Sequence, residues 1–302
     1  MTRPLAILLL ASAVVLGVCG CKNPTAYEKG QQSLAASREL LLEGDRALAA
    51  GGSQRAAENY SKATESLAGA ISPVEDEVRD LEERIRAGTR PAAAGSSRTP
   101  MGSQDAAAAR YYAESLVAHR KLWGLMVAMR GLALSRTAEA HYRAAALAVL
   151  DGDQFYRARQ FNQAARCYGE ADQSLRKALD LYAQTADFLN VKTPAGSPVA
   201  LRDPPTGDLI QEVRQVVAQR RGQADAYLSA TVKRANQTAP IVEAYRDRAA
   251  GNVPTVQIPP LAPLPDLVRH GARQPPVPSH APPEAPAATA TPTNAAAATP
   301  RS

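Results

Sequence analysis

The sequence predicts an all-α protein, and three observations support this fold class. Alanine supplies much of the 45% apolar fraction, and it has the highest intrinsic helix propensity of all residues. Alternating runs of β-branched and aromatic residues, which would indicate strands, are nearly absent. Apolar residues recur instead at three- and four-residue spacings. Because aromatic residues make up only 5% of the chain, we expect long helices packed closely around a thin core.

The first two helices are expected on either side of a glycine turn. Helical periodicity begins near Ala26 and ends near Ala50. The glycines of Gly51-Gly52-Ser53 end this helix because glycine accepts a positive φ, and the serine can cap the next one. That second helix is expected from 54 to 71. Ser72-Pro73-Val74-Glu75 then has the pattern of a helix start, and either a new helix or a kinked continuation follows it.

A linker and a very long helix are expected next. Residues 88 to 103 are rich in proline, glycine and serine, which is typical of a linker. Helical periodicity then runs from about 104 to 150, and its middle is apolar on nearly all sides. Only eight residues separate Lys121 from Arg130 in this apolar stretch, whereas a membrane span needs about 20. The pattern therefore favours the most buried helix of a bundle over a membrane-inserting segment.

The second half of the chain repeats this organisation. A turn is expected near Arg159-Gln160, a helix from 161 to 190, and a proline-containing linker from 191 to 207. Another helix is expected from 208 to about 236. Pro240 is then expected to open a last short helix that ends near residue 250.

The chain changes character after Gly251. Residues 251 to 302 are dominated by proline, alanine and threonine. This composition cannot bury enough apolar surface to offset the entropy of ordering the chain. We expect a disordered tail, with polyproline II character near Pro259-Pro260 and Pro275-Pro276.

The amino-terminal residues form a different kind of segment. Arg3 supplies positive charge, and the apolar run from Leu5 to Val18 is too short for a bilayer but suits a signal-peptide core. The tetrad Val18-Cys19-Gly20-Cys21 resembles the lipobox of bacterial lipoproteins, whose last cysteine receives a diacylglyceryl group and becomes the mature amino terminus. The resemblance implies a signal peptide of residues 1–20 and lipidation at Cys21. An ordinary secretory signal cut near the same glycine is the alternative.

The cysteine content and the net charge exclude some classes of protein. With Cys19 removed and Cys21 lipidated, only Cys167 remains, so no intrachain disulfide is possible, and this thiol is expected to be a small buried hydrophobe. The net charge of +6 suits either solvated helix surfaces or attraction to anionic lipids and wall polymers. Nucleic acid is excluded as a partner because the signal takes the chain out of the cytoplasm.

Two segments align without gaps at an offset of 108 residues, namely 44–63 and 152–171. The shared positions are Gly44/Gly152, Asp45/Asp153, Ala50/Ala158, Gln54/Asn162, Ala56/Ala164, Ala57/Ala165, Tyr60/Tyr168 and Ala63/Ala171. Each segment resembles the helix-turn-helix core of a tetratricopeptide repeat. In such a hairpin the glycine and the alanines let two helices cross closely, and the tyrosine fills the wedge between them.

The resemblance implies a protein-binding groove lined by the first helix of each hairpin. The candidate partner-binding residues are Asp153, Tyr156 and Arg157 on the second copy. Asp45 and Leu48 are their counterparts on the first copy. The first copy departs from the family pattern where the second has aromatic residues, and true arrays repeat at 34 residues without interruption. Two generic alanine-rich hairpins are the alternative.

Patterns that carry catalysis or metal binding are not found in the sequence. It contains no His-Glu-x-x-His, no paired cysteine ligands, no G-x-S-x-G elbow and no phosphate-binding loop. His119 and His141 are separated by about 33 Å of helix and cannot share a metal on a straight helix. Carboxylate pairs such as Glu82-Glu83 suit solvated helix faces. We therefore expect no catalytic residues, no metal and no cofactor other than the lipid on Cys21.

These features predict a defined organisation of the chain. Its parts are a signal peptide (1–20), a lipid-anchored helical hairpin (21–87), a linker (88–103), a second, tetratricopeptide-like hairpin (104–190), a linker (191–207), C-terminal helices (208–250) and a disordered tail (251–302).

The sequence supports three function hypotheses, of which a non-enzymatic lipoprotein is the first. Its lipid would hold a helical scaffold on a membrane, and the hairpin groove or the tail would bind another envelope protein. Lys22, rather than an aspartate, follows Cys21, which favours the outer membrane and a periplasm-facing domain. The second hypothesis is a structural spacer between membrane and wall. The third is an envelope enzyme of unknown type.

Overall fold

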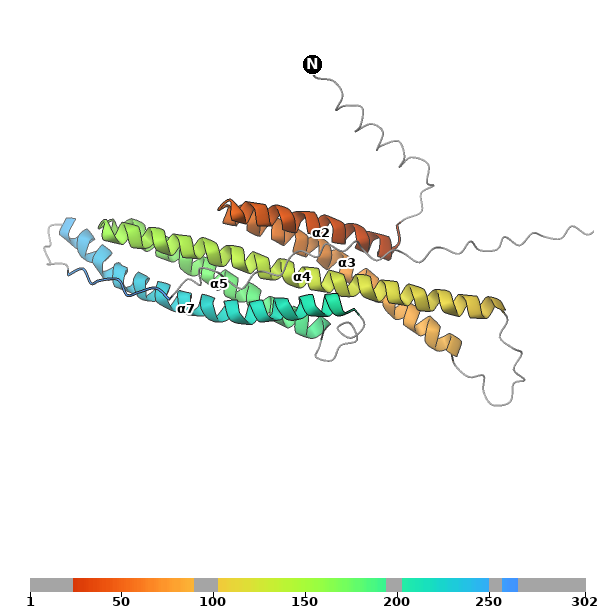
Figure 1. The fold of residues 1–302 in the computed structure, drawn as a ribbon. Helices are drawn as coiled ribbons and strands as arrows, with labels where there is room; N and C mark the ends of the chain where they lie inside the picture. The colour runs from red at the N-terminus through yellow and green to blue at the C-terminus, as the bar shows by residue number, and fades with distance from the viewer. Residues whose placement is uncertain (1–23, 90–102, 194–202, 250–256, 266–302) are drawn as a thin grey trace, which may run out of the picture.

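The computed structural model describes residues 24–89, 103–193, 203–249 and 257–265, and there the predicted all-α fold is confirmed. Five helices lie in the first three of these ranges: α2 (Ala26–Ala49), α3 (Ser53–Thr89), α4 (Ser103–Arg157), α5 (Phe161–Lys192) and α7 (Pro204–Ala249). They pack as an elongated stack of antiparallel hairpins (Figure 1). Cys21, the signal segment and residues 266–302 lie outside the described residues, so neither lipidation nor most of the predicted disordered tail is tested.

The first hairpin has the boundaries that its turn residues predict. Gly51 has a φ of +82°, which L side chains rarely adopt, and it lies in the three-residue turn between the end of α2 at Ala49 and the start of α3 at Ser53. The start of α2 is fixed by a capping box. The Thr25 side chain accepts a hydrogen bond from the Glu28 N–H, and the Glu28 carboxylate accepts one from the Thr25 N–H.

Two prolines lie inside continuous helices. Pro73 lies within α3, so the open question about Ser72-Pro73 is resolved as a continuation of the same helix. The prediction that Pro240 opens a separate helix is wrong, because α7 continues through it to Ala249. An interior proline costs about 3 kcal/mol. Burial of Ile241 against the core offsets part of that cost, and this long-range packing is invisible to a local start signal.

Helix α4 is the centre of the molecule. Its 55 residues extend for about 80 Å, and it contacts each of the other four helices that the structure describes. In the apolar stretch 122–129 all residues but the half-buried Trp123 and Leu125 are buried, which confirms the predicted buried bundle helix, and burial on every side continues over residues 131–140. A Cβ added at Gly131 would lie 2.8 Å from a Leu189 methyl carbon, so glycine permits the close approach of α5. None of the helices in the described ranges is apolar enough over a sufficient length to cross a membrane.

The repeat extends well beyond the two aligned segments. At the same offset of 108 residues, the buried positions of α2 correspond to buried positions in the second half of α4. These pairs are Tyr27/Ser135, Gly30/Ala138, Leu34/Tyr142, Ser37/Ala145, Leu41/Val149 and Gly44/Gly152. The buried positions of α3 and α5 match in the same way, as in Leu67/Leu175 and Val74/Tyr182. The chain therefore contains two copies of one helical hairpin.

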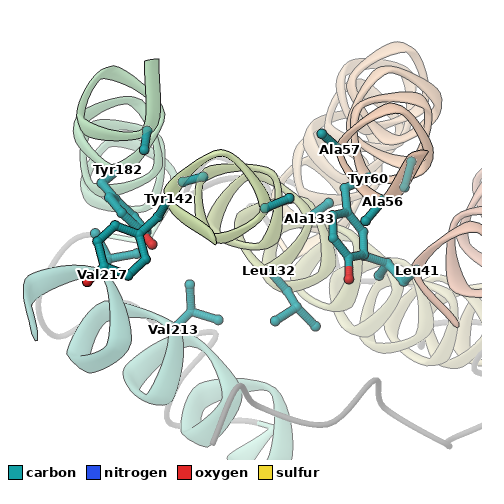
Figure 2. Packing of buried hydrophobic residues seen from close by; sticks show 14 of the residues in the cluster. Leu41, Ala56, Ala57, Tyr60, Leu132, Ala133, Tyr142, Tyr182, Val213 and Val217 are labelled. Carbon is teal, nitrogen blue, oxygen red and sulfur yellow. The ribbon is translucent and has the colours of Figure 1, made fainter. Parts of the chain in front are cut away.

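Each hairpin is covered by a third helix. The first half of α4 covers the α2–α3 hairpin, which we call unit 1, and α7 covers the hairpin of late α4 and α5, which we call unit 2. Figure 2 shows Leu132 and Ala133 of α4 between the two units, with Tyr60 on one side and Tyr182 on the other. Residues 208–249 thus pack on the second hairpin.

Residues 257–265 have an extended conformation and lie against α4 and α7. They differ from the predicted disordered tail because three apolar side chains, Ile258, Leu261 and Leu264, pack against the core. The prediction of disorder rested on the average composition of residues 251–302, in which these three apolar residues are a small minority.

Candidate functional site

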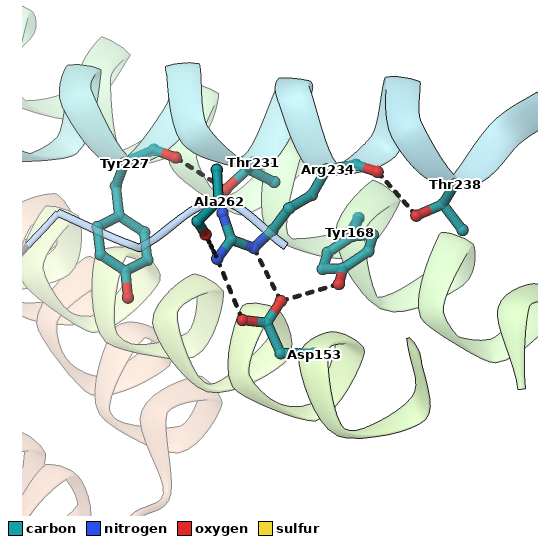
Figure 3. A network of polar contacts seen from close by, with 7 residues as sticks. All are labelled: Asp153, Tyr168, Tyr227, Thr231, Arg234, Thr238 and Ala262. Atoms are coloured by element: carbon teal, nitrogen blue, oxygen red, sulfur yellow. Dashed lines mark hydrogen bonds and ion pairs between the residues drawn. The ribbon is translucent and has the colours of Figure 1, made fainter. Parts of the chain in front are cut away.

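Unit 2 contains a buried ion pair at the point where its three helices meet. Arg234 of α7 donates from Nε to Asp153 Oδ1 at 2.8 Å and from Nη2 to Asp153 Oδ2 at 3.2 Å. Tyr168 of α5 donates its hydroxyl to Asp153 Oδ1 at 2.8 Å (Figure 3). Asp153 is 4% exposed and Arg234 is 2% exposed. This forked geometry gives a strong charge-assisted contact and fixes the position of α7.

Unit 1 repeats this arrangement with equivalent residues. Tyr60 donates to Asp45 Oδ1 at 2.7 Å, and Arg136 of α4 donates from Nη1 to Asp45 Oδ2 at 2.5 Å. We call the two Asp–Tyr–Arg clusters clamp 1 (Asp45, Tyr60, Arg136) and clamp 2 (Asp153, Tyr168, Arg234). The side chain of Asp45 is 38% exposed, so clamp 1 is the more hydrated of the two.

The glycine before each aspartate makes room for the tyrosine ring. A Cβ added at Gly44 would lie 2.2 Å from the Tyr60 ring, and one added at Gly152 would lie 2.6 Å from the Tyr168 ring. Neither distance is possible without movement of the ring. The Gly-Asp pairs of the sequence repeat therefore have two linked roles, which are helix crossing and clamp formation.

Burial keeps the clamp tyrosines protonated. It raises the pKa of Tyr60 and of Tyr168 well above the ordinary value of 10, and the hydrogen bond to the neighbouring aspartate raises each pKa further. Burial also raises the pKa of Tyr227, beside clamp 2, to about 12. The Tyr60 and Tyr168 hydroxyls are therefore protonated at physiological pH and donate to Asp45 and Asp153, so the clamps hold helices together rather than supply a titrating group.

A further buried charged cluster is specific to unit 2. Glu139 of α4 is 2% exposed and forms ion pairs with Arg220 of α7 at 3.1 Å and with Arg143 at 2.9 Å. It also accepts the Tyr182 hydroxyl at 3.2 Å. At the offset of 108 residues, unit 1 has Gln31 in place of Glu139. Helix α7 is thus attached to unit 2 by two buried acidic groups.

The segment 257–265 is docked beside clamp 2. The Tyr156 hydroxyl donates to the Pro259 carbonyl oxygen at 2.8 Å. Arg234 Nη2 donates to the Ala262 carbonyl oxygen at 2.8 Å, as Figure 3 shows, while the same side chain holds Asp153. We call this site, formed by the C-terminal part of α4 and by α7, the α4–α7 groove.

The structure brings together only some of the predicted partner-binding residues. Asp153 and Tyr156 are buried at the α4–α7 groove, where α7 and residues 257–265 cover them. Arg157 is exposed at the end of α4. Asp45 pairs with Arg136, and Leu48 packs against the core. The face predicted to bind a partner is thus covered in unit 2 by the chain itself.

Sequence reasoning missed Arg234, which joins clamp 2 to the docked segment. It lies on the apolar stripe of α7 among Ala224, Tyr227 and Thr231, and an arginine at such a position is a usable signal for a buried ion pair.

Cys167 differs from the expected buried thiol because it is only half-buried. Burial and the nearby Glu170 raise the pKa of that thiol, which disfavours the reactive thiolate.

The described residues contain no group of three histidine, cysteine, aspartate or glutamate side chains arranged to hold a metal ion. A cavity of about 340 Å³ lies between α7 and residues 262–265.

No family model, curated protein or solved structure matches this chain.

Proposed function

We propose that this protein is a lipid-anchored, non-enzymatic scaffold of the bacterial envelope whose tetratricopeptide-like hairpins bind another envelope protein. The lipobox-like tetrad supports anchoring through a lipid on Cys21, and Lys22 favours the outer membrane with the helices facing the periplasm. The repeated hairpins with their clamps supply a rigid helical support for such binding.

The single observation that carries this proposal is the docked segment. The α4–α7 groove already holds an extended piece of polypeptide through Tyr156 and Arg234, which both donate to main-chain carbonyl oxygens. A helical surface that binds one extended segment has the geometry to bind another.

The elongated shape favours a second candidate function, a structural spacer between membrane and wall. Helix α4 alone extends for about 80 Å. A spacer needs length and stiffness but no specific partner. An enzyme has less support, because the buried acidic groups Asp153 and Glu139 are engaged in ion pairs that hold helices together.

The test is crosslinking and pull-down in the native host with the lipidated full-length chain. A discrete envelope protein recovered with it supports the scaffold, whereas recovery of bulk wall or lipid material alone favours the spacer. A Cys21→Ala variant tests the anchor separately: intact-mass analysis of the membrane fraction should show the acylated chain only with the native cysteine.

A further inference from the structure

We propose that the α4–α7 groove is an exchangeable peptide site. In the structure its occupant is the chain's own segment 257–265, and a partner protein replaces that segment with an extended, proline-containing segment of its own. This inference rests on the proposed scaffold function and specifies the binding surface and the kind of partner.

The hydrogen bonds of the groove follow the backbone of its occupant. Tyr156 and Arg234 donate to the carbonyl oxygens of Pro259 and Ala262, which are three residues apart. A carbonyl oxygen is present at every residue, so these two bonds set the path of the segment without selecting its side chains. Another segment with the same path can form the same bonds.

The apolar contacts select a three-residue period. Ile258, Leu261 and Leu264 are half-buried and pack against the core, whereas the positions between them are exposed. Polyproline II has three residues per turn, so every third side chain lies on one face. Prolines at 259, 260, 263 and 265 favour this conformation before binding and so reduce the entropy lost on docking.

Aromatic rings lie at the end of the groove near Pro259. The Tyr156 and Phe161 rings meet edge-on with centroids 5.3 Å apart, and the Phe161 and Tyr245 centroids are also 5.3 Å apart. Tyr245 is 37% exposed. Proline-containing segments commonly bind to grooves lined with aromatic residues. The partner segment is therefore expected to have an apolar residue at every third position and prolines between them.

The main ion pair of the groove does not depend on its occupant. Arg234 remains paired with Asp153 through the two bonds of clamp 2, whether or not Ala262 is present. Loss of the segment thus removes the acceptors of one Arg234 N–H group and of the Tyr156 hydroxyl, without leaving the Arg234 charge unpaired. The cavity of about 340 Å³ beside residues 262–265, lined in part by Ala226 and Ala230, shows that the segment fills the groove incompletely.

The docked segment is covalently connected to α7. A competing peptide therefore needs a high affinity for the groove, unless the affinity of the chain's own segment is reduced. Seven residues, 250–256, connect α7 to the docked segment. A short linker gives an effective concentration in the millimolar range, so a free peptide at micromolar concentration binds the wild-type chain weakly.

The experiment measures binding of a fluorescent peptide with the sequence of residues 257–265 to the full-length chain. Leu261→Asp combined with Leu264→Asp in the chain weakens its own segment. We expect this variant to bind the peptide at least tenfold more tightly than the wild type. Gln257→Asp is the matched control, since it adds a charge at an exposed position of the same segment and removes no proline, and it should bind as the wild type does.

Tyr156→Phe, added to the double variant, keeps the ring but removes the hydroxyl group that donates to Pro259. It should weaken peptide binding severalfold with an unchanged melting temperature. Equal peptide affinity for the wild type and the double variant would overturn the proposal, as would equal affinity with and without the Tyr156 hydroxyl. If the wild-type chain is a dimer and the two leucine substitutions dissociate it, the occupant of the groove is a second copy of the chain. That result would also overturn the proposal. If the pull-down recovers an envelope protein but the peptide experiment gives one of these contrary results, the scaffold function is supported and the exchangeable peptide site is not.

Discussion

Units 1 and 2 have the same hairpin, glycine, tyrosine and clamp, yet they differ in what covers them. Clamp 1 is partly hydrated and joins the hairpin to the middle of α4. Clamp 2 is dry and is shared between α7 and the docked segment. Only unit 2 has the additional Glu139–Arg220 pair. The shared hairpin, glycine, tyrosine and clamp thus stabilise the fold of both units. The docked segment and its contacts occur in unit 2, on the surface that we propose for binding.

The largest expected difference between the units comes from removal of the clamp aspartates. Asp153→Ala leaves the Arg234 charge buried without its main partner, and we expect a loss of about 3–5 kcal/mol in the free energy of unfolding. Asp45→Ala should cost less, about 2–3 kcal/mol, because it too removes the partner of a buried arginine (Arg136 is 4% exposed), but the Asp45 side chain is 38% exposed and water reaches its site. Urea unfolding of the two full-length variants measures both losses. Equal losses would show that the clamps do not differ in hydration.

The glycines that precede the aspartates give the next largest effect. Gly44→Ala and Gly152→Ala place a methyl group within 2.2 Å and 2.6 Å of a buried tyrosine ring, so each should cost about 2–3 kcal/mol. Gly69→Ala and Gly169→Ala are matched controls in α3 and α5, with nothing within 4 Å of the added carbon. The controls should gain about 0.5–1 kcal/mol through helix propensity, as thermal unfolding would show. Stable Gly44 and Gly152 variants would contradict the close crossing of the helices.

The repeat was predictable from sequence because its glycine, alanine and tyrosine positions are local to one hairpin. The arginines of the clamps were not predictable in this way. Arg136 and Arg234 are 98 residues apart rather than 108, because the third helix of each unit follows a linker and has its own register. Pro240 misled the boundary prediction because tertiary burial of Ile241 outweighs a local start signal. Docking of residues 257–265 depends on three apolar residues within a proline-rich background.

A pH titration should separate the units further, because unit 2 has His141 where unit 1 has Ser33. Burial, and secondarily the charge of Lys177, lowers the pKa of His141 from 6.5 to about 4. Between these values the unfolded chain binds a proton that the folded chain does not, so stability is full above pH 6.5 and falls as the pH drops towards 4. Since the ring is only half-buried, we expect a contribution of about 1–2 kcal/mol.

Denaturant unfolding at pH 7 and pH 4.5 measures this contribution. His141→Gln keeps a polar side chain of similar length without a titrating group, and it should lose less stability than the wild type on acidification. An identical acid-induced loss in the variant would show that the proton uptake occurs elsewhere.

The smallest expected effect is the loss of one hydroxyl from each clamp. Tyr60→Phe and Tyr168→Phe keep the ring above the glycine and remove only the bond to the aspartate, so each should cost about 1 kcal/mol. Tyr168→Phe should cost more, because Asp153 is buried and water cannot replace the lost donor. A double-mutant cycle of Tyr168→Phe with Asp153→Ala isolates this contact, and the tyrosine substitution should become nearly neutral once the aspartate is gone. If its cost persists, the ring rather than the hydroxyl stabilises clamp 2, and the difference between the units would then reside in the ion pair alone.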